Sequence, residues 1–152
     1  MAYTCDLVER PTQPTLSIRT SSAVQDLPDV LGQSYGAISQ YLAVLGESPA
    51  GAPFVGYYNM DMQDLDIEIG FPVSKELSGK GNIQTSEIQG GKFAATLHIG
   101  SYGEIESAYD ALSRWMNENG HDSIGVSYEI YLNDPTRVQP NELQTKILFP
   151  LK

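Results

Sequence analysis

Apolar and polar residues alternate in six short stretches of the chain, and this alternation predicts β-strands. In a strand, successive side chains point to opposite faces, so one face can be buried while the other stays polar. The predicted strands cover residues 16–20, 54–58, 65–69, 93–99, 126–132 and 143–149. We therefore expect a fold rich in half-buried strands.

Two other stretches have the helical period. In residues 27–45 the apolar residues recur every three or four positions, and Asp26 and Gly46 stand where an N-cap and a helix stop are expected. Residues 105–116 repeat this pattern with one apolar face. The predicted order of elements is therefore β-α-β-β, followed by a second β-α-β-β.

The two predicted halves also match residue by residue. In the helices the matched residues are Tyr35, Ala37, Ile38, Ser39, Tyr41 and Leu42 against Tyr109, Ala111, Leu112, Ser113, Trp115 and Met116. In the last strands Ile69 matches Ile147. In the strands before them Tyr58 matches Tyr131, which sets Gly56 opposite Glu129. Three aligned segments in the same order indicate an internal duplication.

A duplicated chain of this kind predicts an α+β fold with pseudo-two-fold symmetry. The tandem β-α-β-β halves would form antiparallel sheets with two main helices and a central ligand groove. We expect a single domain over residues 1–152, with half one at about 14–73 and half two at about 92–152. Residues 74–91 are rich in Gly and Ser and weakly periodic, which predicts a connector.

Composition excludes several classes of function. The chain has 152 residues, of which 41% are hydrophobic, and a net charge of -10 from 19 acidic and 9 basic residues. Such a charge repels a phosphate backbone, so we expect no direct binding to nucleic acid. With one cysteine and two histidines, neither a metal site nor a cofactor is expected. No apolar run is long enough to span a membrane and no secretion signal is present, so the expected location is cytoplasmic.

Glu129 is the candidate for chemistry. Alternation places it with Ser127 and Tyr131 on one face of the strand at residues 126–132. Partial burial would raise the pKa of this carboxyl unless a cation or a hydrogen-bond donor offsets the desolvation, and a cationic ligand could supply that charge. The alternative is a solvated glutamate, or one paired with a nearby cation. The cations considered are Lys92, Lys146 and Arg137.

Aromatic residues are expected around this carboxylate. Phe54 and Tyr58 point into the predicted groove from the first half, and Gly56 leaves room beside Glu129 because it has no side chain. Trp115 and the matched Tyr41 could each form a wall of the pocket. Aromatic faces with one carboxylate favour a planar or lipophilic cation. For any one of these rings, ordinary core packing is the simpler interpretation.

Three further carboxylates share a face of the strand at residues 65–69. They are Asp64, Asp66 and Glu68, which alternate with apolar residues. Residues two apart on a strand diverge too much to hold one ion. We therefore predict a solvated strand face rather than a metal site.

The chain resembles the GyrI-like family, which also forms the effector-binding domain of AraC-type and MerR-type transcription regulators. The resemblance covers nearly the whole chain and rests on several short motifs in order. They are Asp66-Ile67-Glu68-Ile69-Gly70-Phe71-Pro72-Val73, Gly91-Lys92-Phe93-Ala94, His98-Ile99-Gly100-Ser101-Tyr102, Ala108-Tyr109 with Trp115, Glu129-Ile130-Tyr131-Leu132-Asn133-Asp134-Pro135, and Thr145-Lys146-Ile147 near Phe149-Pro150.

This resemblance implies a multidrug-type binding protein whose Glu129 contacts a lipophilic, cationic aromatic compound. Residues 1–15 are too short for a helix-turn-helix segment, so a stand-alone binding domain is expected. Two alternatives stay open. One is hydrolysis of strained cyclopropane-type DNA-alkylating compounds by Glu129 and Tyr131. The other is regulation of a protein partner such as gyrase.

Overall fold

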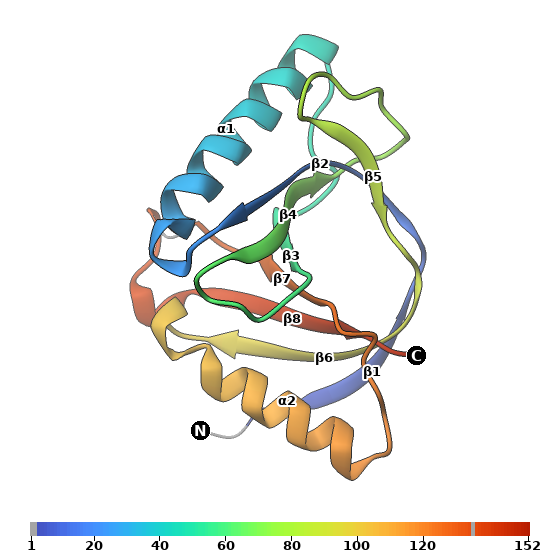
Figure 1. Cartoon of the computed structure of the whole chain (residues 1–152), viewed down its shortest axis with the longest axis vertical. Helices are drawn as coiled ribbons and strands as arrows, with labels where there is room; N and C mark the ends of the chain where they lie inside the picture. Colours follow the sequence, from blue (N-terminus) through green and yellow to red (C-terminus); the bar gives the residue numbers. More distant parts are fainter. Residues whose placement is uncertain (1–2, 135) are drawn as a thin grey trace. The chain divides into compact units, whose positions relative to one another are not determined.

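The structure, a computed structural model, describes residues 3–134 and 136–152. It divides into two compact units. The central unit is Thr12–Gln89, and the terminal unit joins Met1–Pro11 to Gly90–Lys152. Each unit contains one long helix and a set of antiparallel strands (Figure 1).

The central unit is an antiparallel sheet covered by one helix. Its elements are β2 (Gln13–Ser22), the 3-10 turn η1 (Val24–Asp26), α1 (Leu27–Leu45), β3 (Phe54–Tyr57), β4 (Leu65–Pro72) and β5 (Gln84–Ile88). β4 pairs with both β3 and β2, and β2 pairs on its other side with β5. The strand order in this unit is therefore β3-β4-β2-β5.

The terminal unit repeats this plan with a strand contributed by the start of the chain. Its elements are β1 (Cys5–Arg10), β6 (Gly91–Ile99), the 3-10 turn η2 (Tyr102–Glu104), α2 (Glu106–Glu118), β7 (Ser127–Tyr131), the 3-10 turn η3 (Pro140–Glu142) and β8 (Gln144–Pro150). The pairings give the order β1-β6-β8-β7. In Figure 1, α2 runs alongside β6.

Each helix buries one apolar face against the sheet of its own unit. In the central unit, Ile38 and Leu42 of α1 belong to a cluster with Leu16 of β2. In the terminal unit, Leu112 of α2 packs in a cluster with Ile147 of β8. Burying one such side chain contributes about 1.5–3 kcal/mol. In each unit, the apolar residues that recur with the helical period therefore pack against those that alternate along the strands.

The α+β class, the antiparallel pairing and the two main helices agree with the sequence predictions. Helix α1 begins and ends at the predicted residues, and Gly46 ends it in the left-handed conformation with φ 71. Asp26 occupies the N-cap position, but its side chain makes no capping hydrogen bond. The predicted N-cap position is therefore confirmed, although the turn η1 leads directly into α1 and Asp26 itself has helical φ and ψ.

Two strands, β1 and β5, were not predicted from the sequence. The segment 74–91, predicted to be a connector, contains β5, and the start of the chain forms β1. Both strands lie at the end of the strand order in their unit, and most of their side chains are exposed or half-buried. A strand with little buried surface needs no apolar alternation, so its sequence carries no clear signal.

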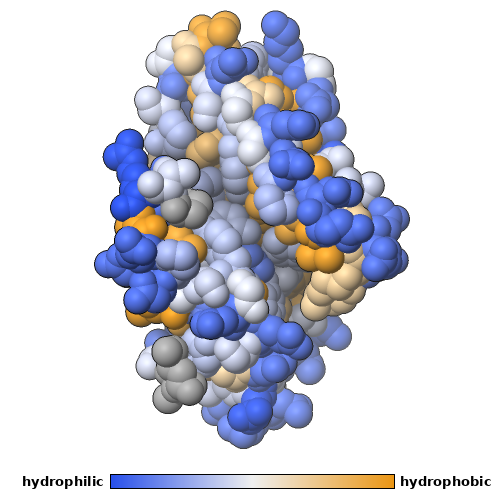
Figure 2. Space-filling view, turned by 90° about the vertical axis from the view of Figure 1, so that its left-hand side faces the viewer, coloured by the Kyte–Doolittle hydropathy of each residue, from blue (hydrophilic) through white to orange (hydrophobic). Residues whose placement is uncertain are grey.

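The face of the molecule drawn in Figure 2 is mainly polar. Figure 2 shows hydrophilic residues over much of the visible face, with hydrophobic residues in small separate groups. Several large apolar side chains are exposed, among them Val44, Met60 and Ile124. Scattered exposure of this kind is ordinary for folded proteins. Within the described residues, no helix is both long enough and apolar enough to cross a membrane.

Candidate functional site

Glu129 is buried in the terminal unit, with 8% of its surface exposed. It lies on β7 directly opposite Ile147 of β8, and Ile147 packs against α2. Directly opposed residues of an antiparallel pair share a sheet face. The carboxylate of Glu129 is therefore on the face that α2 covers.

Two tyrosine hydroxyls donate hydrogen bonds to this carboxylate. Tyr109 of α2 donates to Oε2 at 2.5 Å, and Tyr131 of β7 donates to Oε1 at 2.9 Å. Tyr109 is placed there because it lies one helical turn before Leu112, a residue of α2 whose side chain is completely buried. Each carboxylate oxygen thus has one donor and keeps further acceptor capacity.

Burial raises the pKa of Glu129 above its ordinary value. The hydrogen bonds from Tyr109 and Tyr131 oppose this shift, and so does the charge of His98. Burial dominates because a carboxylate loses its hydration in a low-dielectric interior. The site therefore holds a carboxyl group whose ionisation depends on its immediate neighbours.

A further aromatic ring contacts Tyr131, which donates to the carboxylate. The ring of Tyr102, in the turn η2, meets the ring of Tyr131 edge-on with centroids 5.6 Å apart. Tyr102 is 40% exposed, so this pair reaches the surface. The pKa of the Tyr102 hydroxyl is raised by burial and by the negative charges of Glu129 and Asp134. An aromatic and negatively charged surface of this kind favours cations.

Two buried polar residues complete the same sheet face. His98 of β6 and Tyr131 of β7 are both directly opposite Thr145 of β8, so the three side chains form a row across the sheet. His98 is 1% exposed and Thr145 is 0% exposed. Among the described residues, the Thr145 hydroxyl has no hydrogen-bond partner. An unsatisfied buried hydroxyl costs about 1–3 kcal/mol, so it marks a position where a polar atom would be stabilised.

The register corrects the match between the two halves. Glu129 pairs with Ile147, and Val55 pairs with Ile69. Because Ile69 matches Ile147 in the repeat, the counterpart of Glu129 is Val55 and not Gly56. Gly56 lies one residue further along β3, on the opposite sheet face. The one-residue difference was not visible in the sequence, because the two halves were aligned by matching Tyr58 with Tyr131.

Glu68 is a second buried carboxylate, although the sequence predicted a solvated strand face. It is 7% exposed and accepts hydrogen bonds from the Ser17 and Tyr58 hydroxyls, both at 2.6 Å. The Arg19 guanidinium lies 3.7 Å from the centre of the Tyr58 ring and forms a two-point ion pair with Asp66. The prediction is wrong for Glu68 because hydroxyl groups of β2 and of the residue after β3 replace its water.

The other predicted ligand residues are spread over the two units. Trp115 of α2 stacks on His121, with centroids 5.5 Å apart. The Tyr41 hydroxyl donates to the carbonyl of Ser78, and Phe54 is 1% exposed in the central unit. Contact of these rings, of Tyr58 and of Gly56 with a ligand stays a prediction.

Four residues of the Glu129 site were not singled out from the sequence as site residues. They are Tyr109, Tyr102, His98 and Thr145. Tyr109 lies 20 residues from Glu129, and only the packing of α2 onto the sheet brings the two together. A partial indication of Tyr109 was present in the sequence, because this residue matches Tyr35 in the alignment of the two helices.

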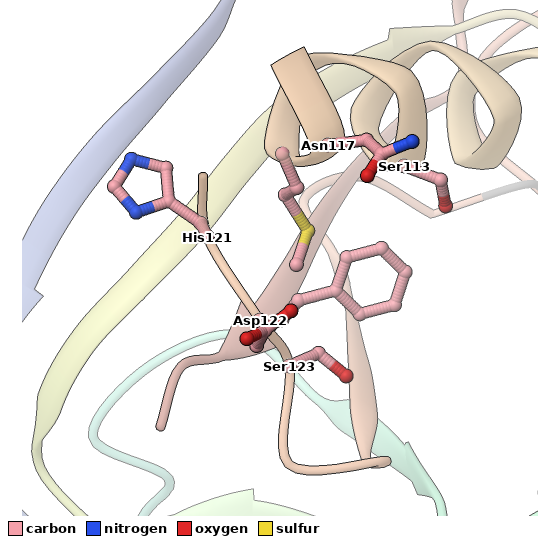
Figure 3. Close-up of a pocket in the computed structure, with 7 residues that line it drawn as sticks. Ser113, Asn117, His121, Asp122 and Ser123 are labelled. Carbon is pink, nitrogen blue, oxygen red and sulfur yellow. The ribbon is translucent and has the colours of Figure 1, made fainter. Parts of the chain in front are cut away.

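A surface pocket of about 280 Å³ opens at the C-terminal end of α2 (Figure 3). Its lining residues are Ser113, Met116, Asn117, His121, Asp122, Ser123 and Phe149. In Figure 3, Ser113 and Asn117 project from the helix, while Asp122 and Ser123 follow on the loop after it. Glu129 is not among these residues. Within the part of the chain that the structure describes, no group of three acidic, histidine or cysteine side chains could hold a metal ion.

The fold is that of an α+β domain, and one of its strands carries a buried, tyrosine-bonded carboxylate. The model of the GyrI-like small molecule binding domain matches residues 4–152. The chain belongs to this family. A search among curated proteins gives no match.

Solved structures with the same fold include EcmrR in complex with DNA and the isolated C-terminal domain of EcmrR. The chain is 23% identical to EcmrR in a complex with DNA, with a TM-score of 0.86, and covers 99% of itself but 57% of that chain. It matches the isolated EcmrR C-terminal domain with a TM-score of 0.82 over 100% of this chain and 99% of that one. It thus spans little more than half of the EcmrR chain in the DNA complex.

Two further neighbours have lower identity. A hydrolase from Listeria innocua is 15% identical, with a TM-score of 0.71, over 98% of this chain and 92% of that one. SAV2435, solved bound to tetraphenylphosphonium, is 9% identical, with a TM-score of 0.65, over 100% of this chain and 94% of that one. At these identities the likeness shows the shared fold.

Proposed function

We propose that the protein binds a lipophilic aromatic cation, whose positive charge lies next to the carboxylate of Glu129. The observation that carries this proposal is the burial of that carboxylate at 8% exposure. No Lys or Arg among the described residues forms an ion pair with it. A buried anion without such a partner is costly, and a bound cation offsets part of that cost.

The surroundings of Glu129 support the aromatic part of the proposal. Tyr131 donates to the carboxylate and also contacts the ring of Tyr102, so the charge and the aromatic surface are continuous. A flat aromatic cation would gain contact with these rings while its charge approaches the carboxylate. SAV2435, which shares the fold, was solved with an aromatic phosphonium cation, and this agrees with the proposed class of ligand.

The test compares two probes that differ mainly in charge. Methyltriphenylphosphonium carries a positive charge, and triphenylphosphine oxide is a neutral molecule of similar shape. Glu129→Gln should weaken the cation about 10- to 100-fold, equivalent to roughly 1.4–2.8 kcal/mol, and change the neutral probe about threefold at most. Calorimetric titration measures both affinities.

Glu68→Gln is the matched control, because Glu68 is also a buried carboxylate that accepts two hydroxyl hydrogen bonds. This variant should bind the cation as the wild type does. Equal weakening of both probes by Glu129→Gln would refute charge recognition at Glu129. An equal effect of the two variants would show that the loss is not specific to this site.

Hydrolysis is a second candidate function, favoured by the 2.5 Å contact between the Tyr109 hydroxyl and Glu129. A buried carboxyl with a raised pKa can hold a proton at neutral pH and deliver it. In hydrolysis of a strained cyclopropane, the oxygen of water bonds to one ring carbon as the ring bond breaks. The electron pair of that bond passes to the conjugated acceptor, which takes the proton of the Glu129 carboxyl, and the proton released by the attacking water then returns to Glu129.

Mass spectrometry distinguishes turnover from binding. Incubation with a cyclopropane-bearing DNA alkylator should give a product that has gained one water, and Glu129→Gln should abolish this product. Tyr109→Phe and Tyr131→Phe test which hydroxyl assists Glu129. An unchanged alkylator after long incubation with excess protein would reject the hydrolase function and leave the binding function standing.

A further inference from the structure

Thr145 carries a buried hydroxyl that no neighbouring group uses. The residue is 0% exposed on β8, and among the described residues its Oγ1 has no hydrogen-bond partner. A buried hydroxyl without a partner is unfavourable, because it has lost its water and has gained no contact in return. Such a group calls for an explanation, and a bound molecule is one.

The polar neighbours of Thr145 are engaged elsewhere. His98 and Tyr131 lie directly opposite Thr145 on the two adjacent strands. The ring nitrogens of His98 lie 2.9 Å from a backbone carbonyl oxygen and 3.1 Å from a tyrosine hydroxyl. The Tyr131 hydroxyl donates to Glu129. The sheet thus places two polar side chains beside Thr145, and both have their polar atoms in other contacts.

Thr145 and Glu129 are diagonal neighbours on one sheet face. Glu129 is directly opposite Ile147, and Thr145 lies two residues before Ile147 on the same strand. Residues in this diagonal relation lie about 7–8 Å apart, within reach of a long side chain. One nitrogen that donates a hydrogen bond of about 2.9 Å to each of two oxygens can bridge a gap of roughly 5 Å between them. The spacing therefore suits a single donor that bonds both side chains.

The carboxylate of Glu129 can accept such a donor. Tyr109 and Tyr131 donate one hydrogen bond each to its two oxygens. A carboxylate has about four acceptor sites, so it keeps capacity for more. A donor with a positive charge would give the Thr145 hydroxyl a partner and would also offset the cost of the buried carboxylate.

We propose that the ligand of this site is an aromatic molecule with a primary ammonium group, whose N–H groups donate to Glu129 and to the hydroxyl of Thr145. The inference rests on the proposed cation-binding function and adds the chemistry of the head group to it. The aromatic part lies against the rings of Tyr102 and Tyr131, of which Tyr102 is 40% exposed. Thr145 is the residue that distinguishes this head group from a quaternary one.

The distinction depends on hydrogen bonding and not on charge. A primary ammonium has three N–H donors, whereas a quaternary ammonium or a phosphonium has the same charge and no donor. The carboxylate attracts all of these cations, but a quaternary head group leaves the Thr145 hydroxyl buried and without a partner. A site that hydrogen-bonds one group rejects an analogue that lacks it, because the polar atoms of the site then stay unpaired.

Two probes with the same aromatic part and the same charge test the proposal. They are 1-naphthylmethylammonium, which has N–H donors, and its N,N,N-trimethyl counterpart, which has none. Thr145→Val replaces the hydroxyl by a methyl group of similar size. It should weaken the first probe about tenfold, equivalent to about 1.4 kcal/mol, and the second about twofold at most. Calorimetric titration measures both affinities, and the comparison of variants for each probe separately cancels the difference in probe size.

Two further variants serve as controls. Thr145→Ser keeps the hydroxyl and should keep the preference for the first probe. Thr15→Val makes the matched change on β2 of the other unit, where Thr15 is also buried and its hydroxyl has no partner in the part of the chain that the structure describes. It should leave both affinities unchanged. An equal loss of both probes in Thr145→Val, or a loss of neither, would overturn the proposal.

Urea unfolding gives a second readout that needs no ligand. Thr145→Val should raise the midpoint of unfolding by about 0.5 M, since a methyl group suits a buried position without a partner better than a hydroxyl does. A purely structural role of the hydroxyl would instead lower stability and binding together. A lower midpoint for Thr145→Val would show that the hydroxyl has a partner within the protein, which would overturn the proposal.

The same titrations separate this inference from the proposed function. If both probes bind to the wild type and depend on Glu129 but not on Thr145, cation binding stands and the inference about the head group is wrong. If neither probe binds to the wild type, the proposed function itself fails, and the inference fails with it.

Discussion

Replacing Glu129 by glutamine should stabilise the protein relative to the wild type, and increasingly so as the pH rises. The carboxyl is buried, and burial raises its pKa in the folded protein. In the unfolded chain the carboxyl returns to an ordinary pKa of about 4.3. Between these two values the folded protein keeps the proton and the unfolded chain has lost it.

Stability therefore falls as the pH rises through this window, since the folded state binds the proton more tightly. The slope is about 1.4 kcal/mol per pH unit for one carboxyl, and it vanishes below the ordinary pKa and above the raised one. Glu129→Gln has no proton to lose at this position. For a chain of this size the difference in Tm between variant and wild type should grow by about 3–6 °C per pH unit.

Urea unfolding at a series of pH values from 4 to 8 measures the effect, because all other titrating groups are common to both proteins and cancel in the difference. Glu87→Gln, which replaces an exposed carboxylate on β5, controls for the general loss of one negative charge. A difference that stays constant with pH would refute the raised pKa. A difference that moves in favour of the wild type as the pH rises would show that the tyrosines and His98 outweigh burial.

Two further predictions concern the central unit. In Gly70→Ala the new Cβ would lie 2.5 Å from the Leu16 carbonyl oxygen, so we expect a loss of about 1–3 kcal/mol in urea unfolding. Gly36→Ala on the exposed side of α1 meets nothing within 4 Å and should gain about 0.5–1 kcal/mol, so equal effects of the two variants would contradict this account. Arg19→Ala removes a two-point ion pair with Asp66 and a contact with an aromatic ring. Because both side chains of the pair are almost half exposed, the expected loss is only about 1–2 kcal/mol, and a loss above this range would indicate a buried role.

Much of the fold could be predicted from the sequence because its signal is local. Helix α1 follows from the period of Ile38 and Leu42 and from the glycine that ends it, and each inner strand follows from alternation. These patterns are written into neighbouring residues and need no knowledge of the rest of the chain. β1 and β5 were missed because a mostly exposed strand buries too little surface to need an apolar pattern.

The candidate site was predictable only in part. Alternation singled out Glu129 in the middle of a strand with Tyr131 on the same face, and the structure places the Tyr131 hydroxyl on that carboxylate. Alternation defines two faces of a strand but does not say which face a helix covers. The hydrogen bond from Tyr109 to Glu129 and the electrostatic effect of His98 on its pKa therefore depended on the packing of α2 and β6 around it.

Glu68 shows the same division between sequence and tertiary structure. Its spacing in β4 resembled that of a solvated row of acidic residues, and nothing local distinguished it from Asp66. The Ser17 and Tyr58 hydroxyls make its burial tolerable, and they come from β2 and from the residue that follows β3. The sequence by itself determined the elements and placed the carboxylates on strands. The tertiary structure decided which of them lost water, because desolvation depends on everything that packs around a charge and not on its position along the chain.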